Sequence, residues 1–118
     1  MKLKLFVIAG VLSMVSNVGF TKNPTAINYN TDVTLKGYIT KTAGYPTLNL
    51  KEGITAIATP DNVLYGTEKN VKRMQIAWSK GTKLPTGCVI ATGQLYGAHT
   101  AHHKTSTLID LKSYKKCK

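Results

Sequence analysis

Two stretches of alternating residues, each built around a central glycine, constrain the fold of this chain more than any other feature of its sequence. Residues 33–39 and 89–95 place apolar side chains at matched positions around Gly37 and Gly93. A period of two indicates a half-buried strand, and a glycine inside a strand is typical of a bulge or a tight bend. Two bent strands of this kind favour a small closed barrel over a flat sheet.

The remaining strands are expected at regular intervals along the chain. We predict five in all, over residues 33–40, 47–59, 72–78, 88–96 and 105–112, with a break in the second near Glu52 and Gly53. No amphipathic helix of ten or more residues is expected after residue 21. These observations predict an all-β protein, a small five-stranded OB-like barrel whose usual helix is reduced to a loop. A small open β-sandwich is the alternative.

The first 21 residues have the layout of a secretory leader. Lys2 and Lys4 precede an uncharged apolar run over residues 5–15, and small and polar residues follow up to Thr21. The run is shorter than the roughly 20 residues that span a bilayer. We therefore expect a signal peptide over 1–21, a linker or arm over 22–31 and a single β-barrel domain over 32–118, in a periplasmic or secreted protein. An uncleaved anchor or a buried first helix is the alternative.

The two cysteines, Cys88 and Cys117, are expected to form a disulfide, because an exported chain meets oxidising conditions. Two free thiols or a metal-bound pair are the competing interpretations. If the cysteines lie opposite each other on two antiparallel strands, extrapolation of that register places Leu95 opposite Asp110. The histidines then lie at the far tip of the hairpin.

The balance of charge favours anionic partners. The formal net charge is +11, and removal of a leader that carries two lysines and no acid would leave +9. Such an excess predicts attraction to acidic proteins, lipid headgroups, cell-wall polymers or nucleic acid. Arg73 is the only arginine, and bidentate reading of phosphate or guanine favours arginine, so sequence-specific nucleic-acid recognition is not expected. A solvated lysine-rich surface that keeps the protein soluble is the simpler alternative.

All three histidines, His99, His102 and His103, fall within five positions. Three imidazoles are a candidate ligand set for a divalent transition metal such as zinc, copper or nickel. On a strand, however, His102 would point away from the other two, and no acid lies within six residues to orient the rings. A hydrogen-bonded polar tip with Thr100 and Thr105, or direct contact with a partner, are the alternatives.

The sequence around these histidines resembles a known family. Residues 92–105 (TGQLYGAHTAHHKT) and the apolar residues 108–111 resemble the bacterial exported family called domain of unknown function 4431. Residues 33–37 and 68–71 extend the likeness over most of 33–111. The resemblance implies an envelope location but no activity, since none is established for the family. It also implies that five residues act together: His99, Thr100, His102, His103 and Thr105.

Catalysis is not expected, because the five acids of the mature chain are isolated and no serine lies in a nucleophile elbow. We expect a non-catalytic binding module of the cell envelope, such as an inhibitor or immunity-type protein acting on an acidic protein partner. Metal binding through the histidines and non-specific binding of anionic polymers are the alternatives. Tyr38 and Tyr96, on the polar faces of the bent strands, are candidate contact residues, together with Thr100, Lys104 and Thr105.

Overall fold

The computed structural model describes residues 22–42, 45–58, 66–98 and 104–117. The predicted signal peptide over 1–21 lies outside the described residues. Within them, no helix has the length and apolar character that crossing a membrane requires. The strands are β1 (Ala26–Asn28), β2 (Asp32–Thr42), β3 (Tyr45–Ile57), β4 (Glu68–Ala77), β5 (Gly87–Gly97) and β6 (Thr107–Lys116).

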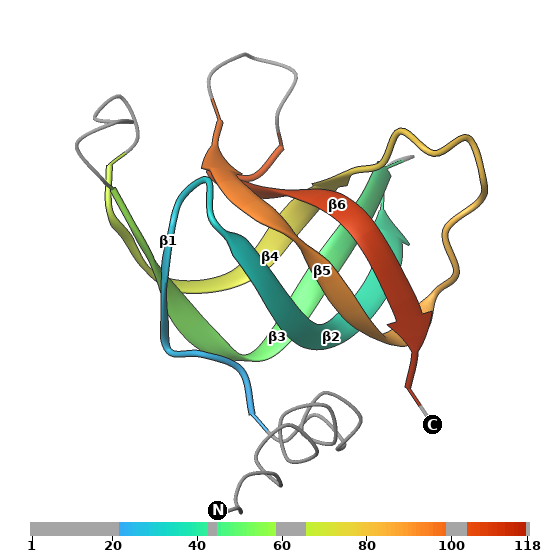
Figure 1. Cartoon of the computed structure of the whole chain (residues 1–118), viewed down its shortest axis with the longest axis horizontal. Coiled ribbons are helices and arrows are strands. Elements are labelled where there is room, and N and C mark those ends of the chain that lie inside the picture. The colour runs from blue at the N-terminus through green and yellow to red at the C-terminus, as the bar shows by residue number, and fades with distance from the viewer. Residues whose placement is uncertain (1–21, 43–44, 59–65, 99–103, 118) are drawn as a thin grey trace, which may run out of the picture.

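Strands β2 to β6 form a closed barrel, in which β3, β2, β5, β6 and β4 are successive neighbours and β4 pairs again with β3 (Figure 1). Every neighbouring pair in the barrel is antiparallel except β4 and β6, which run parallel. A five-stranded barrel connected in this way has the topology of the OB fold. The predicted OB-like barrel is therefore confirmed, and the open sandwich is not the architecture of the described strands.

The alternation of each strand builds the core. On β2, Leu35 and Ile39 are fully buried, whereas the intervening Lys36 and Tyr38 face solvent. Full burial of one such aliphatic side chain contributes about 1.5–3 kcal/mol. The other strands contribute residues of the same kind to one continuous cluster, among them Leu48, Ile54, Val71, Met74, Ile76, Val89, Leu95, Ile109 and Leu111.

Gly37 and Gly93 lie where two strands approach closely. A Cβ atom at Gly37 would lie 2.8 Å from the carbonyl oxygen of Asn49 on β3. At Gly93 a Cβ atom would overlap the carbonyl oxygen of Asp110 on β6. The register of β5 against β6 shifts between Thr92 and Gly93, so Gly93 marks a bulge, as its place within the alternating stretch predicts.

That bulge corrects the predicted register of the hairpin. Near the disulfide, Val89 lies opposite Lys116, in agreement with the register extrapolated from the cysteines. Beyond Gly93 the pairing has slipped by one residue, so Leu95 faces Ile109 and not Asp110. The predicted pair of Leu95 with Asp110 is wrong because the inserted bulge residue allows two buried aliphatic side chains to face each other inside the barrel.

The segment 22–31, expected to be a linker or a loosely held arm, is packed against the barrel. Its strand β1 pairs in parallel with β3, with Ile27 opposite Ala56. Ile27 and Tyr29 are buried in the core cluster, and the Asn30 amide donates to the Leu95 carbonyl at 2.9 Å. A strand of three residues is too short to display an alternating pattern, so the sequence signal for it is weak.

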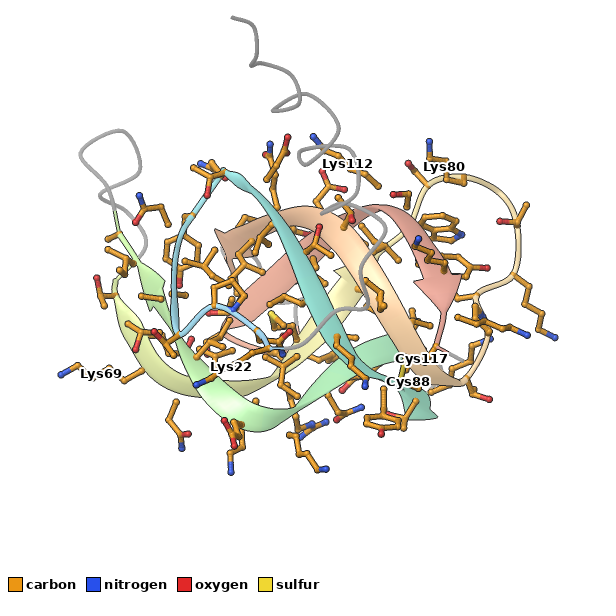
Figure 2. The ribbon with its side chains drawn as sticks, turned by 60° about the horizontal axis from the view of Figure 1, so that its bottom comes forward. Lys22, Lys69, Lys80, Cys88, Lys112 and Cys117 are labelled. Atoms are coloured by element: carbon orange, nitrogen blue, oxygen red, sulfur yellow. A yellow bond between two sulfur atoms is a disulfide. The ribbon has the colours of Figure 1, made fainter. Side chains whose placement is uncertain are left out.

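Cys88 and Cys117 form the predicted disulfide, with their Cα atoms 5.4 Å apart (Figure 2). The Cys117 amide also donates to the Cys88 carbonyl at 3.1 Å. The bond therefore joins the start of β5 to the residue that follows β6 and closes the open end of this hairpin.

Candidate functional site

The predicted metal ligands His99, His102 and His103 lie outside the described residues, as does Thr100. Within the described ranges, no group of three or more His, Cys, Asp or Glu side chains is placed to hold a metal ion. The structure does describe the chain on both sides of this segment, up to Ala98 and from Lys104 onward. The connection between β5 and β6 can therefore be considered from its fixed ends.

The chain that leads into β6 is held against β4 by hydrogen bonds. The Gln75 amide donates to the Thr105 hydroxyl at 2.9 Å, and this hydroxyl donates to the Thr107 carbonyl at 2.7 Å. The Lys104 amide donates to Gln75 Oε1 at 2.7 Å. Thr105, a predicted contact residue, thus uses its hydroxyl for hydrogen bonds within the fold. The side chain of its neighbour Lys104 is exposed.

A carboxylate, Glu68 at the start of β4, lies beside the same connection. The Ser106 hydroxyl is 2.6 Å from each of its oxygens, and the Thr107 hydroxyl donates to Oε1 at 2.7 Å. Thr107 is 1% exposed, and its hydroxyl also lies 3.1 Å from that of Tyr29. The sequence shows no acid near the histidines, but the fold brings Glu68 to Ser106 from 38 residues away. The only sequence signal for Glu68 is its place in the stretch 68–71 that resembles the family.

A second feature is a cavity on the outside of the barrel that we name the arm groove. Its lining includes three lysines, one aromatic residue and one acid, namely Lys22, Lys36, Lys51, Tyr38 and Glu52, and its volume is about 400 Å³. Tyr38 is 47% exposed, and it is the single exposed large hydrophobic residue in the described part of the chain. The structure thus places this predicted contact residue among cationic side chains.

The arm groove exists because β2 and β3 separate along their length. Their described pairing ends with Tyr38 opposite Asn49, beyond which β3 turns toward β4 and β1. The arm enters the space between them. Asn23 binds β2 through its side chain, which accepts from the Lys36 amide at 2.8 Å and donates to the Lys36 carbonyl at 3.0 Å. Two residues later, the Thr25 carbonyl accepts from the Thr55 amide of β3 at 2.9 Å.

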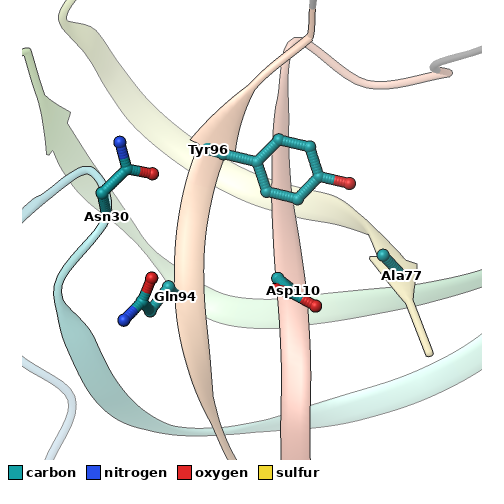
Figure 3. Close-up of a pocket in the computed structure, with 5 residues that line it drawn as sticks. All are labelled: Asn30, Ala77, Gln94, Tyr96 and Asp110. Carbon is teal, nitrogen blue, oxygen red and sulfur yellow. The ribbon is translucent and has the colours of Figure 1, made fainter. Parts of the chain in front are cut away.

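Tyr96, the other predicted contact aromatic, lies in a different hollow. This open depression of about 400 Å³ is lined by Asn30, Ala77, Gln94, Tyr96 and Asp110 (Figure 3). Tyr96 extends from β5 toward β6, where Asp110 supplies an exposed carboxylate. Tyr38 and Tyr96 therefore do not form one binding face, and their surroundings differ in charge.

Most of the basic side chains on the described surface have no acidic partner. The described residues contain a single ion pair, in which Lys112 Nζ lies 3.5 Å from Asp32 Oδ1. A hydrogen bond of 2.8 Å from Gln94, together with the charge of Lys112, lowers the pKa of Asp32. Lysines such as Lys22, Lys69 and Lys80 are spread around the barrel (Figure 2), and excess positive charge at its surface attracts anions.

The sequence between the end of β4 and the end of β6 identifies a family. Residues 74–115 match the family described as Domain of unknown function (DUF4431). Over this segment the chain is similar to the DUF4431 family. The match confirms the resemblance found in the sequence and covers the whole of the β5–β6 hairpin up to Lys115, including the histidines, while Glu68 lies outside it. No significant match is found among curated proteins or among solved structures.

Proposed function

We propose that this protein is a non-catalytic binding module of the cell envelope that attaches to an acidic protein partner through the outside of its barrel. The observation that carries the proposal is the uncompensated positive charge of the described surface. Among the described residues only Lys112 has an acidic partner within ion-pair distance. Two of the acids, Asp32 and Glu68, are already engaged by donors of the same chain.

The rigidity of the barrel supports a binding role. The disulfide joins the two ends of the β5–β6 hairpin, and the arm is hydrogen-bonded to both β2 and β3. A surface that is ordered before binding loses little conformational entropy when a partner attaches. An inhibitor or immunity-type protein, which must block a partner on encounter, benefits from such preorganisation and from electrostatic attraction during association.

The proposal is tested with a fluorescein-labelled peptide of ten glutamates. The oxidised protein is expected to bind it at 50 mM salt, with an affinity that falls at least tenfold by 200 mM salt, because the attraction is between charges exposed to solvent. Fluorescence anisotropy measures both affinities. The proposal is wrong if there is no binding at 50 mM salt. A peptide of ten alternating glycines and serines serves as the uncharged control.

A second candidate function is the binding of zinc, copper or nickel through His99, His102 and His103. The observation that favours it is Glu68, since a carboxylate next to a metal-binding segment orients imidazole ligands. Glu68 contacts Ser106 and Thr107, which directly follow the histidine-containing connection.

Calorimetric titration of the protein with each metal distinguishes this candidate. We expect micromolar or tighter binding that is lost in the variant with all three histidines replaced by alanine. Binding should also weaken as the pH falls through about 6, because an imidazole must be neutral to ligate a metal. Glu68→Gln should reduce the affinity about tenfold if the carboxylate orients a ligand. Equal affinity in the triple-alanine variant would exclude a histidine site.

A further inference from the structure

The arm groove combines charges from three separate parts of the chain. Lys22 belongs to the arm, Lys36 to β2 and Lys51 to β3, and all three line the same cavity of about 400 Å³. Lysines that merely keep a surface soluble have no reason to gather around one hollow. An anionic group in this cavity would therefore be attracted by positive charge from three sides.

Tyr38 gives the groove a feature that a purely electrostatic surface lacks. Its neighbours Leu35 and Ile39 are buried, but Tyr38 points out of the barrel with 47% of its surface exposed. Tyrosine offers a large rigid contact area with few rotatable bonds, which is why it is enriched in binding surfaces. It lies opposite Cys88 on β5, so the ring is carried by a part of β2 that pairs with the disulfide-linked strand.

The remaining charged residue, Glu52, limits the kind of ligand that fits. Its carboxylate lines the groove together with the three lysines. A nucleic acid or a polyphosphate carries negative charge at every repeat, and it would meet repulsion from Glu52. A segment of protein can place carboxylates against the lysines, an apolar side chain against Tyr38 and a backbone or side-chain donor against Glu52.

The walls of the groove are also fixed before a ligand arrives. Asn23 bridges the amide and the carbonyl of Lys36 at 2.8 and 3.0 Å, so the arm is bound to the strand that carries two of the lining residues. Because these backbone groups are already satisfied, recognition is left to the side chains of the groove. A preformed cavity with a few placed polar groups is the usual form of a specific site.

We infer that the arm groove binds an extended acidic segment of the partner protein, with carboxylates against Lys22, Lys36 and Lys51 and an apolar side chain against Tyr38. This inference rests on the proposed function and assigns the attachment to one face of the barrel. It predicts that two lysines inside the groove matter far more than two equally exposed lysines elsewhere.

The test uses a fluorescein-labelled peptide of ten residues, eight glutamates with a central leucine followed by one serine whose hydroxyl can donate to Glu52, and measures its affinity by anisotropy. The double variant Lys36→Glu/Lys51→Glu is expected to bind at least tenfold more weakly than the unmodified protein. The matched control Lys80→Glu/Lys83→Glu has the same net charge, and its two substitutions lie in the β4–β5 connection. We expect the affinity of this control variant for the peptide to fall less than threefold. Circular dichroism checks that both variants keep the β-rich fold.

Tyr38 is tested separately with the same peptide. Tyr38→Ala should weaken binding about fivefold, whereas Tyr38→Phe, which keeps the ring, should change it less than twofold. When serine replaces the leucine of the peptide, the unmodified protein and Tyr38→Ala should bind it with the same affinity. Equal affinity of the unmodified protein and Tyr38→Ala for the leucine peptide would contradict the assigned role of the ring.

The outcomes separate the inference from the function on which it rests. Equal losses of peptide affinity in the two lysine double variants would show that the arm groove is not the binding site. Binding would then be a property of the basic surface as a whole. Binding of a ten-residue thymidylate at least as tight as that of the peptide, and equally sensitive to Lys36→Glu/Lys51→Glu, would overturn the assignment to a protein segment. Failure of the unmodified protein to bind any anionic probe would overturn the proposed function itself.

Discussion

The Thr107 hydroxyl at the start of β6 donates a hydrogen bond of 2.7 Å to the Glu68 carboxylate on β4, although 39 residues separate the two in the chain. The Tyr29 hydroxyl of the arm lies 3.1 Å from the same threonine oxygen and bonds to the Gly66 carbonyl at 3.3 Å. Three parts of the chain thus meet around one half-buried carboxylate. Hydrogen bonds to a charged acceptor are stronger than neutral ones.

Replacement of Glu68 by alanine is expected to lower the free energy of unfolding by about 1–3 kcal/mol, because two hydroxyl donors lose their charged acceptor. Glu68→Gln keeps one acceptor oxygen, so its free energy of unfolding should fall by less than that of Glu68→Ala. Urea denaturation at pH 7 measures both. Glu52→Ala removes an exposed carboxylate and serves as the control, with an expected change within about 0.5 kcal/mol. A loss in Glu68→Ala no larger than that of the control would contradict the prediction.

A methyl group at Gly93 should disrupt the bulge that sets the β5–β6 register. The added Cβ atom would overlap the Asp110 carbonyl oxygen, a backbone atom that cannot rotate away. We expect Gly93→Ala to lower the free energy of unfolding by about 1–3 kcal/mol, as in other overpacked sites. Gly66→Ala is the control, because a Cβ atom there meets no atom within 4 Å. Similar midpoints of urea unfolding for the two variants would contradict the prediction and show that β6 can shift at the bulge to make room for the methyl group.

Loss of the Cys88–Cys117 disulfide should reduce stability without changing the fold. The bond closes a loop between residues 29 positions apart, and the chain-entropy model gives a stabilisation of about 3–4 kcal/mol for a loop of that length. The variant Cys88→Ala/Cys117→Ala should therefore unfold at a lower urea concentration, as should the reduced unmodified protein. Added reductant must leave the variant unchanged, and a reductant effect there would mean that something other than this bond is responsible.

Asp32 should titrate below its ordinary range. The hydrogen bond from Gln94 is the largest cause of the lowered pKa, and the positive charge of Lys112 is the next. Its contribution to stability is present above the pKa of the unfolded chain and disappears as the pH falls through the lowered pKa of the folded state. A carbon-detected NMR titration should show that Gln94→Ala raises the pKa of Asp32 more than Lys112→Met does. A larger rise of the pKa of Asp32 in Lys112→Met would mean that the charge of Lys112 is the main cause of the lowered pKa.

Thr47 offers a site where stability can be gained. Its hydroxyl is fully buried and finds no hydrogen-bond partner within the described structure. Valine has nearly the same shape without the polar group, so Thr47→Val should raise the free energy of unfolding by about 1 kcal/mol. Thr107→Val is the contrasting variant, because its hydroxyl is used by Glu68. It should lose stability by a similar amount, and a gain in both variants would argue against hydrogen bonding as the cause.

The local features of this protein could be predicted from its amino-acid sequence alone. Alternation around Gly37 and Gly93 identified two barrel strands, because the side chains of a strand point to opposite faces with a period of two. Both glycines lie at close approaches between strands, and the two cysteines form the predicted disulfide. The likeness around the histidines identified the family that matches residues 74–115. Each of these signals lies within a short window of the chain or in a single pair of residues.

Contacts between residues far apart in the chain depend on the folded barrel and could not be predicted from local patterns. The bulge at Gly93 moved Leu95 from Asp110 to Ile109, because β6 carries one extra residue, Lys112, between the partners of Thr92 and Gly93. Glu68 at the start of β4 meets Thr107 at the start of β6, and these two strands are parallel neighbours in the closed barrel. The arm groove likewise arises where β2 and β3 separate and the arm enters. Such sites depend on how the closed barrel brings remote strands together, and no local window of sequence encodes that contact.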